Sequence, residues 1–147
     1  MRAIRRYQYW RQRSGLFSSF VRKFVVLRYQ FWRAVAGADI PLNCDIGGGL
    51  VMPHPNGIVI YPSAKIGVNC LIFQQVTIGT RDGAGVPVIG GHVDVGAGAK
   101  ILGSIRIGAH ARIGANAVVL TDVPPGAVAV GIPARIIQEQ APVDTTG

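Results

Sequence analysis

The sequence predicts an all-β protein, a parallel β-helix of hexapeptide repeats preceded by a short helical segment. The main observation is an aliphatic residue at every sixth position: Ile89, Val95, Ile101, Ile107, Ile113 and Val119. Side chains repeat every two residues on a strand and every 3.6 on a helix, so a period of six fits neither. Four of these residues are followed directly by glycine, which suits tight, repeated turns. Such a period is typical of a coil in which each hexad forms one short side.

The same period extends toward the N-terminus in two earlier registers. The first register contains Ile40, Ile46, Met52 and Ile58, and the second contains Ile60, Ile66, Ile72 and Ile78. The register slips by two residues near Pro53–Ile60, and the period is interrupted at Thr80–Val88. Insertions into a solenoid are expelled as loops, commonly on the face that binds something. We therefore expect function at these two irregular places.

The first 36 residues lack the repeat and are expected to be helical. Apolar residues from Phe17 to Trp32 recur near helical spacing, and Gly37 is a typical stop. Nine of the fifteen basic residues precede residue 34, and no acidic residue precedes Asp39. This helix can pack on the coils or on another subunit, or lie on an anionic membrane surface. Nucleic-acid binding is the least favoured alternative, because no recognisable binding module accompanies the charge.

The chain length of 147 residues indicates one domain with a small appendage. We expect a basic amphipathic helical segment at residues 1–38, the β-helix at 39–137 and a flexible tail at 138–147. No apolar run approaches the roughly 18–20 residues of a membrane-spanning helix. Arg22 and Lys23 interrupt any apolar core of a signal peptide, so we expect a cytoplasmic protein. Contact with the inner face of the membrane is the variant of this expectation that the basic helix suggests.

Four motifs between Asp39 and Ile137 make the prediction more specific. They are Val76–Gly79, Gly96–Gly103, Ile113–Leu120 and Gly131–Arg135. In this order and at this spacing they resemble the serine acetyltransferase branch of the hexapeptide acyltransferases. The resemblance implies a left-handed triangular β-helix, a homotrimer, and acetyl-CoA as a donor bound between neighbouring subunits. The period by itself leaves the handedness open.

The resemblance also implies two catalytic residues. His54 occupies the place of the general base, and Asp39, fifteen residues earlier, that of the acid that orients its imidazole. A hydroxyl is a poor nucleophile at neutral pH, so a base must take its proton as it attacks the thioester. A carboxylate on the other ring nitrogen fixes the tautomer and stabilises the imidazolium that forms. We expect the loop at Thr80–Val88 to lie beside His54, with its N–H groups stabilising the oxyanion.

The donor site is implied in the same way. The backbones expected to line the pantetheine channel are those of Gly79, Thr80, Ala97 and Ala115. Arg112 and Arg135 are candidates for the CoA phosphates, because a guanidinium suits bidentate contact. No metal site is expected, since Cys44 and Cys70 fit no ligand pattern and read as small buried hydrophobes. His92 and His110 occupy polar corners of hexads and are expected to be exposed.

The acceptor is where the chain departs from serine acetyltransferases. Pro53 stands where that family has an aspartate that contacts the amino acid, and Val86 where it has a histidine that holds the serine carboxylate. The compact loop, which begins with the stretch Thr77–Arg81, and the short basic N-terminal segment resemble more closely the colanic-acid-type exopolysaccharide acetyltransferases. We therefore expect an acetyl-CoA-dependent O-acetyltransferase that acts on a sugar hydroxyl in polysaccharide assembly. The resemblance to this second branch implies lipid-linked sugars as the acceptors. The alternatives are a serine acetyltransferase of cysteine synthesis and a non-catalytic trimeric scaffold.

Overall fold

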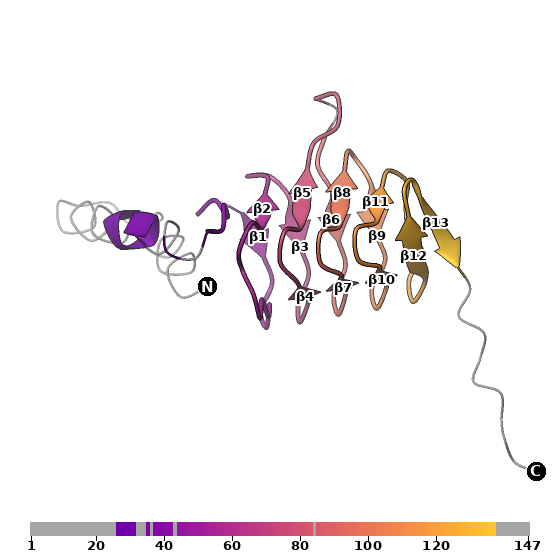
Figure 1. Cartoon of the computed structure of the whole chain (residues 1–147), viewed down its shortest axis with the longest axis horizontal. Helices are drawn as coiled ribbons and strands as arrows, with labels where there is room; N and C mark the ends of the chain where they lie inside the picture. Colours follow the sequence, from indigo (N-terminus) through magenta and orange to yellow (C-terminus); the bar gives the residue numbers. More distant parts are fainter. Residues whose placement is uncertain (1–25, 32–34, 36, 43, 84, 138–147) are drawn as a thin grey trace, which may run out of the picture.

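The computed structural model describes residues 26–31, 35, 37–42, 44–83 and 85–137 of the chain. Short strands in this part wind into a coil with three flat faces (Figure 1). Neighbouring coils pair in parallel, so each face is a sheet that runs along the coil axis. The predicted class, a parallel β-helix of hexapeptide repeats, is confirmed.

Each face collects one strand from successive coils. Face A contains β2 (Val59–Ile60), β5 (Thr77–Gly79), β8 (Lys100–Leu102) and β11 (Val118–Val119). Face B contains β1 (Asp45–Ile46), β3 (Lys65–Ile66), β6 (Val88–Ile89) and β9 (Arg106–Ile107). Face C contains β4 (Leu71–Ile72), β7 (Asp94–Val95), β10 (Arg112–Ile113), β12 (Val128–Gly131) and β13 (Ala134–Ile137). The chain visits the faces in the order A, B, C, and we name the edges between them A–B, B–C and C–A.

The register of the coils explains both irregularities in the sequence. Val59 pairs with Thr77, 18 residues later, so a regular coil holds three hexads. Asp39 pairs with Val59, 20 residues later, and this longer coil contains the slip near Pro53. Thr77 pairs with Lys100, 23 residues later, and that coil contains the interruption after residue 79. The extra residues leave the stack at its edges, and the faces stay in register.

The core is the aliphatic stripe that defines the period. All six hexad residues from Ile89 to Val119 are buried, with at most 3% of the side chain exposed. Three small residues in the preceding inward position, Ala99, Ala111 and Ala117, are completely buried. Burying an aliphatic side chain contributes roughly 1.5–3 kcal/mol. Because each coil covers only the coils next to it, this stabilisation comes from stacking.

The glycines that follow the aliphatic residues have a steric cause. A Cβ added to Gly67 would lie 2.4 Å from the carbonyl carbon of Gly90 in the next coil. A Cβ added to Gly96 would lie 2.6 Å from the main-chain nitrogen of Ala115. Non-bonded contacts of a Cβ atom are not this short in proteins, so the close approach of the coil backbones requires glycine at these positions.

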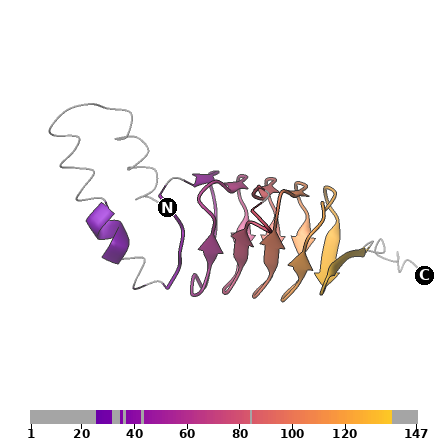
Figure 2. The ribbon, with the colours of Figure 1, turned by 90° about the horizontal axis from the view of Figure 1, so that it is seen from above.

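The two ends of the stack differ. At the N-terminal end residues 26–31 are helical, and the hydroxyl of Tyr29 donates a hydrogen bond to the carbonyl of Ile40 (Figures 1 and 2). At the other end β12 and β13 form an antiparallel hairpin. Residues 1–25 and 138–147, expected to be helical and flexible, lie outside the described residues. No helix within the described part is long and apolar enough to cross a bilayer.

Candidate active site

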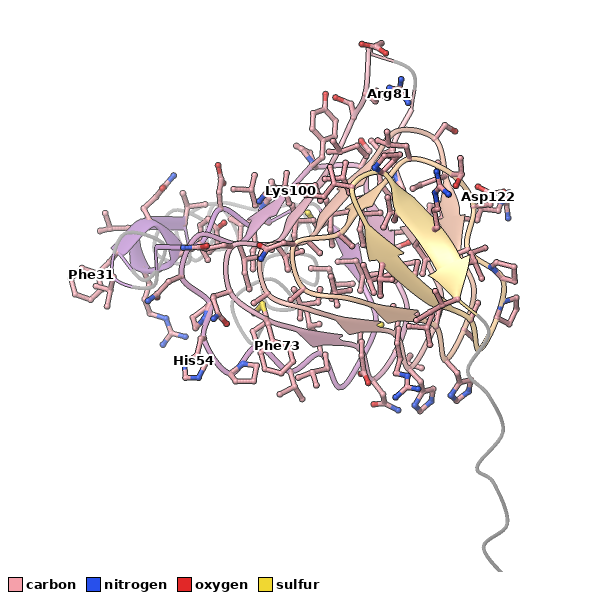
Figure 3. The ribbon with its side chains drawn as sticks, turned by 45° about the vertical axis from the view of Figure 1, so that its right-hand side comes forward. Phe31, His54, Phe73, Arg81, Lys100 and Asp122 are labelled. Carbon is pink, nitrogen blue, oxygen red and sulfur yellow. The ribbon has the colours of Figure 1, made fainter. Side chains whose placement is uncertain are left out.

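His54 lies in the turn that carries the first irregularity, on the C–A edge. The turn follows Val51 on face C and leads into β2 on face A. The amide of Ile58 donates to the carbonyl of Pro55 at 3.2 Å, which closes the turn. The imidazole of His54 is exposed at the surface of the stack (Figure 3).

Asp39 lies next to this edge, at the start of the first coil, where it pairs with Val59 of face A. Its amide donates to the carbonyl of Ile58 at 2.7 Å, and its carbonyl accepts from the amide of Ile60 at 2.9 Å. Gly57 also donates to the carbonyl of Gly37, so the chain around Asp39 runs alongside the residues that follow His54. The Asp39 residue is half-buried. Asp39 and the turn that holds His54 are therefore joined through the backbone of residues 57–60.

A ladder of backbone hydrogen bonds continues from the His54 turn along the C–A edge. The amide of Gln75 donates to the carbonyl of Asn56, that of Gly98 to Gln74, and that of Asn116 to Ala97. Neighbouring coils in such a ladder are about 4.8 Å apart. His54, Gln74, Ala97 and Ala115 each follow an aliphatic residue of face C by two positions: Met52, Ile72, Val95 and Ile113. One edge therefore carries the predicted base and two of the predicted donor contacts.

The other two predicted donor contacts lie on a different edge. Gly79 ends β5 and accepts a 3.0 Å hydrogen bond from the amide of Gly103, and Thr80 begins the loop that projects at the A–B edge (Figure 1). Arg81 and Asp82 near its tip form an exposed ion pair at 3.4 Å. The expectation that this loop lies beside His54 is wrong within one chain (Figure 3). The insertion follows face A, whereas the His54 turn precedes it.

The two candidate phosphate contacts are on strands of face C. Arg112 is exposed on β10, in register with Asp94 on one side and Val128 on the other. Arg135 is exposed on β13, opposite Val130. Because β13 closes the C-terminal end of the stack, Arg135 is separated from the His54 turn by nearly the whole length of the coil (Figure 1).

Two residues at or next to the C–A edge, Gln74 in the edge itself and Lys100 on face A, were not singled out from the sequence. The side-chain oxygen Oε1 of Gln74 is buried and has no hydrogen-bond partner among the described residues. The ammonium of Lys100 donates a 2.7 Å hydrogen bond to the carbonyl of Gln75. The hexad position that Gln74 shares with His54 is the sequence signal that identifies it.

Serine acetyltransferases share both the sequence and the fold. The enzyme of Synechococcus elongatus is 44% identical over 108 residues, which cover 71% of this chain and 44% of that protein. The enzyme of Mycobacterium tuberculosis is 42% identical over 113 residues, which cover 75% of this chain and 49% of that protein. The soybean serine acetyltransferase apoenzyme superposes with a TM-score of 0.77 at 39% identity, over 92% of this chain and 55% of that one. A serine acetyltransferase in complex with CoA superposes with a TM-score of 0.74 at 36% identity, over 92% of this chain and 55% of that one.

The chain belongs to the hexapeptide-repeat acyltransferase family. Its fold is the left-handed parallel β-helix of the serine acetyltransferases. The chain spans about half the length of the relatives described above. No family model matches the sequence. The relatives named above are serine acetyltransferases, so the similarity favours that alternative over the sugar-directed enzymes predicted first.

The cysteines of this acyltransferase-family chain are part of the core, as the sequence predicted. Cys44 and Cys70 are both buried. Burial, together with the charge of Asp39, raises the pKa of the Cys44 thiol to about 11. Burial also raises the pKa of Cys70. A thiol is nucleophilic only as the thiolate, so neither residue is suited to carry an acyl group.

The remaining histidines lie on the B–C edge, away from the C–A edge. His92 and His110 are exposed, as predicted, and their rings stack with centroids 4.8 Å apart and planes 5° from parallel. No group of three or more His, Cys, Asp or Glu side chains in the described part of the chain could hold a metal ion.

Proposed function

We propose that this chain is an acetyl-CoA-dependent O-acetyltransferase and that L-serine is its acceptor. One observation carries the proposal: the exposed imidazole of His54 shares an edge with Ala97 and Ala115, and Asp39 lies next to this edge. A base stands at one end of a row of small residues along which an extended thioester can lie. The similarity to serine acetyltransferases supports serine as the acceptor and acetyl-CoA as the donor.

In the proposed reaction His54 takes the proton of the acceptor hydroxyl as its oxygen attacks the thioester carbonyl. Asp39 orients the imidazole and stabilises the imidazolium that forms. The tetrahedral intermediate then expels the CoA thiolate, which receives the proton from His54. Transfer is direct, in keeping with two cysteines whose pKa values are raised by burial. Because acetyl-CoA is the donor, we assign the reaction to the cytoplasm.

We further propose that the site is completed in a homotrimer. Gly79 and Thr80 lie on the A–B edge, whereas Ala97 and Ala115 lie on the C–A edge, so one chain alone does not bring them together. A neighbouring subunit that packs its A–B edge against the C–A edge of the first assembles one channel. Arg112 and Arg135 are the candidates to hold the phosphates of the donor, with Arg135 at the far end of the channel.

The outward side chains support such packing. Val51 on face C, and Val59 and Tyr61 at face A, are apolar and between 42% and 53% exposed. The equivalent outward positions of face B carry charges at Asp45, Lys65 and Arg106, with Val88 as the apolar exception, whereas those of face C include Asp94 and Arg112 farther along the stack. The exposed apolar side chains at the first coils of faces A and C therefore support contact with another subunit there.

A sugar hydroxyl is the second candidate acceptor. Pro53, next to the base, cannot form the charged contact that an aspartate makes in the serine acetyltransferases. Val86, in the loop, cannot hold a carboxylate as the histidine of that family does. Both substitutions would take away an amino-acid contact that the resemblance implies, while His54, Asp39 and the donor edge are kept.

The test is release of the CoA thiol from acetyl-CoA with L-serine or with a panel of nucleotide-linked and lipid-linked sugars. We expect turnover with serine, and a His54→Ala variant at least about 10²-fold slower. His92→Ala is the matched control, because His92 is also exposed but lies on the B–C edge. If a sugar is acetylated and L-serine is not, the sugar is the acceptor and the proposal of serine is wrong. No turnover with any acceptor, and no CoA binding by calorimetry, would leave a non-catalytic scaffold.

A further inference from the structure

The helical residues before the first coil present an apolar face to the outside. Leu27, Phe31 and Val35 are 70%, 63% and 61% exposed, and their spacing of four residues places them on one side of a helix. Tyr29 lies on the opposite side, where its hydroxyl donates to the carbonyl of Ile40. The ring of Phe31 points away from the coils (Figure 3). The helix thus contacts the stack through one side and exposes its apolar side.

Basic charge is concentrated in the same part of the chain. Nine of the fifteen basic residues precede residue 34, and no acidic residue precedes Asp39. Arg28, next to Leu27, is exposed. The rest of the sequence carries six basic and seven acidic residues and is nearly neutral. The apolar face therefore belongs to a segment whose charges all have one sign.

We propose that the face formed by Leu27, Phe31 and Val35 docks on an anionic lipid surface. Apolar side chains of an interfacial helix enter the boundary between headgroups and acyl chains, while basic residues around them contact lipid phosphates. Charge decides between this occupant and a second copy of the chain. A second copy would bring two acid-free, basic segments together, whereas an anionic surface neutralises them.

Trimer formation would strengthen the docking of the helix on lipid. This part of the proposal rests on the homotrimer proposed above. A cyclic trimer repeats each surface feature three times about one axis. The helix lies at one end of the stack, so parallel stacks would present three such faces at the same end (Figure 2). Three weak contacts made together hold far more tightly than one, because the second and third are intramolecular.

Vesicle flotation with the full chain, without acetyl-CoA, tests the proposal separately from catalysis. We expect binding to vesicles of phosphatidylcholine with phosphatidylglycerol, little binding to phosphatidylcholine alone, and a decrease as salt is raised. A Leu27→Gln/Phe31→Gln/Val35→Gln variant should partition at least about tenfold more weakly. Val68→Gln is the matched control, because Val68 is 48% exposed on the B–C edge and should float like the wild type.

Four results would overturn the proposal: equal binding to neutral vesicles, no binding to either kind, binding that salt does not weaken, and undiminished binding of the triple variant. If sedimentation shows a smaller assembly for the triple variant and the wild type binds no vesicles, the face joins copies of the chain. Circular dichroism establishes that the triple variant is folded. If the triple variant is not folded, two measurements still test the proposal. They are flotation of an Arg28→Glu variant, which should bind anionic vesicles more weakly, and flotation of the wild type with anionic and neutral vesicles at increasing salt.

Discussion

The ammonium of Lys100 donates a 2.7 Å hydrogen bond to the main-chain carbonyl of Gln75 and so joins face A to the C–A edge. The backbone of Gln75 has a φ of 58°, a left-handed conformation that residues other than glycine rarely adopt. Its amide donates to the carbonyl of Asn56 in the His54 turn. The lysine therefore braces the edge on which we place the reaction.

Replacing Lys100 with Met should weaken this brace while keeping the length of the side chain. We expect a loss of about 0.5–1.5 kcal/mol in the free energy of unfolding. The effect on acetyl transfer should appear in kcat, since small displacements of a catalytic group can slow a reaction about 10²-fold. Lys65→Met on face B is the control for loss of a surface charge. Equal effects of the two variants on kcat would show that Lys100 does not position the edge.

The backbone contact between Gly67 and Gly90 should make Gly67→Ala strongly destabilising. The added Cβ would lie 2.4 Å from backbone, so coils must separate, at a cost of about 2–3 kcal/mol. Gly79→Ala is the control, because the nearest atom to its added Cβ, a side-chain carbon of Leu102, is at 3.8 Å. Urea unfolding followed by circular dichroism measures both. A Gly67→Ala chain as stable as Gly79→Ala would mean that the coils can shift freely.

The raised pKa of Cys44 should reduce stability at alkaline pH. The thiol ionises in the unfolded chain near its ordinary value of 9.0 but in the folded chain at about 11. Between these values the folded state binds more protons than the unfolded state, so the free energy of unfolding falls as pH rises from 9 to 11. Cys44→Ala, though less stable at every pH, should lose less stability over this window. Parallel curves for the two proteins would contradict the assignment.

The hexad period was sufficient to predict the core, because it follows from packing one aliphatic residue on each short side of a coil. It did not reveal β13. Residues Ala134–Ile137 are half-buried or exposed and pair antiparallel with β12, so they lack the inward stripe that marks the other strands.

The placement of the candidate site was predictable only in part. The match of His54, Ala97 and Ala115 in hexad position puts them on one edge, and the sequence contains that information. The edge at which an insertion leaves the stack depends on which face the chain has just completed. At residue 80 the chain has completed face A, so the loop leaves at the A–B edge, away from His54 on the C–A edge of the same chain. The stacking of His92 on His110 likewise depends on the 18-residue register.

The apolar side chains at the first coils predict how the proposed trimer can be broken. Val59→Arg puts a charge among the exposed apolar side chains of the first coils, at a position that is 42% exposed in the single chain, so its burial between subunits would leave that charge unpaired. We expect monomers by sedimentation velocity, an unchanged circular dichroism spectrum, and loss of acetyl transfer. Lys65→Glu, an outward charge change on face B, should leave the assembly intact. A trimeric, active Val59→Arg chain would remove face A from the interface.

Pro53 and Val86 offer a test of the acceptor that does not depend on finding the right sugar. Pro53 adjoins the base and Val86 lies in the loop of the A–B edge, so in the proposed trimer both face one acceptor. Pro53→Asp restores an anion for an amino group and Val86→His a partner for a carboxylate, contacts that charge makes stronger than neutral hydrogen bonds. Together they should raise kcat/KM for L-serine by about tenfold or more, mostly through KM. Pro53→Asn with Val86→Gln, which adds neutral polar groups of similar size, is the control. If the double variant turns over serine no faster than the wild type, this chain recognises its acceptor in another way.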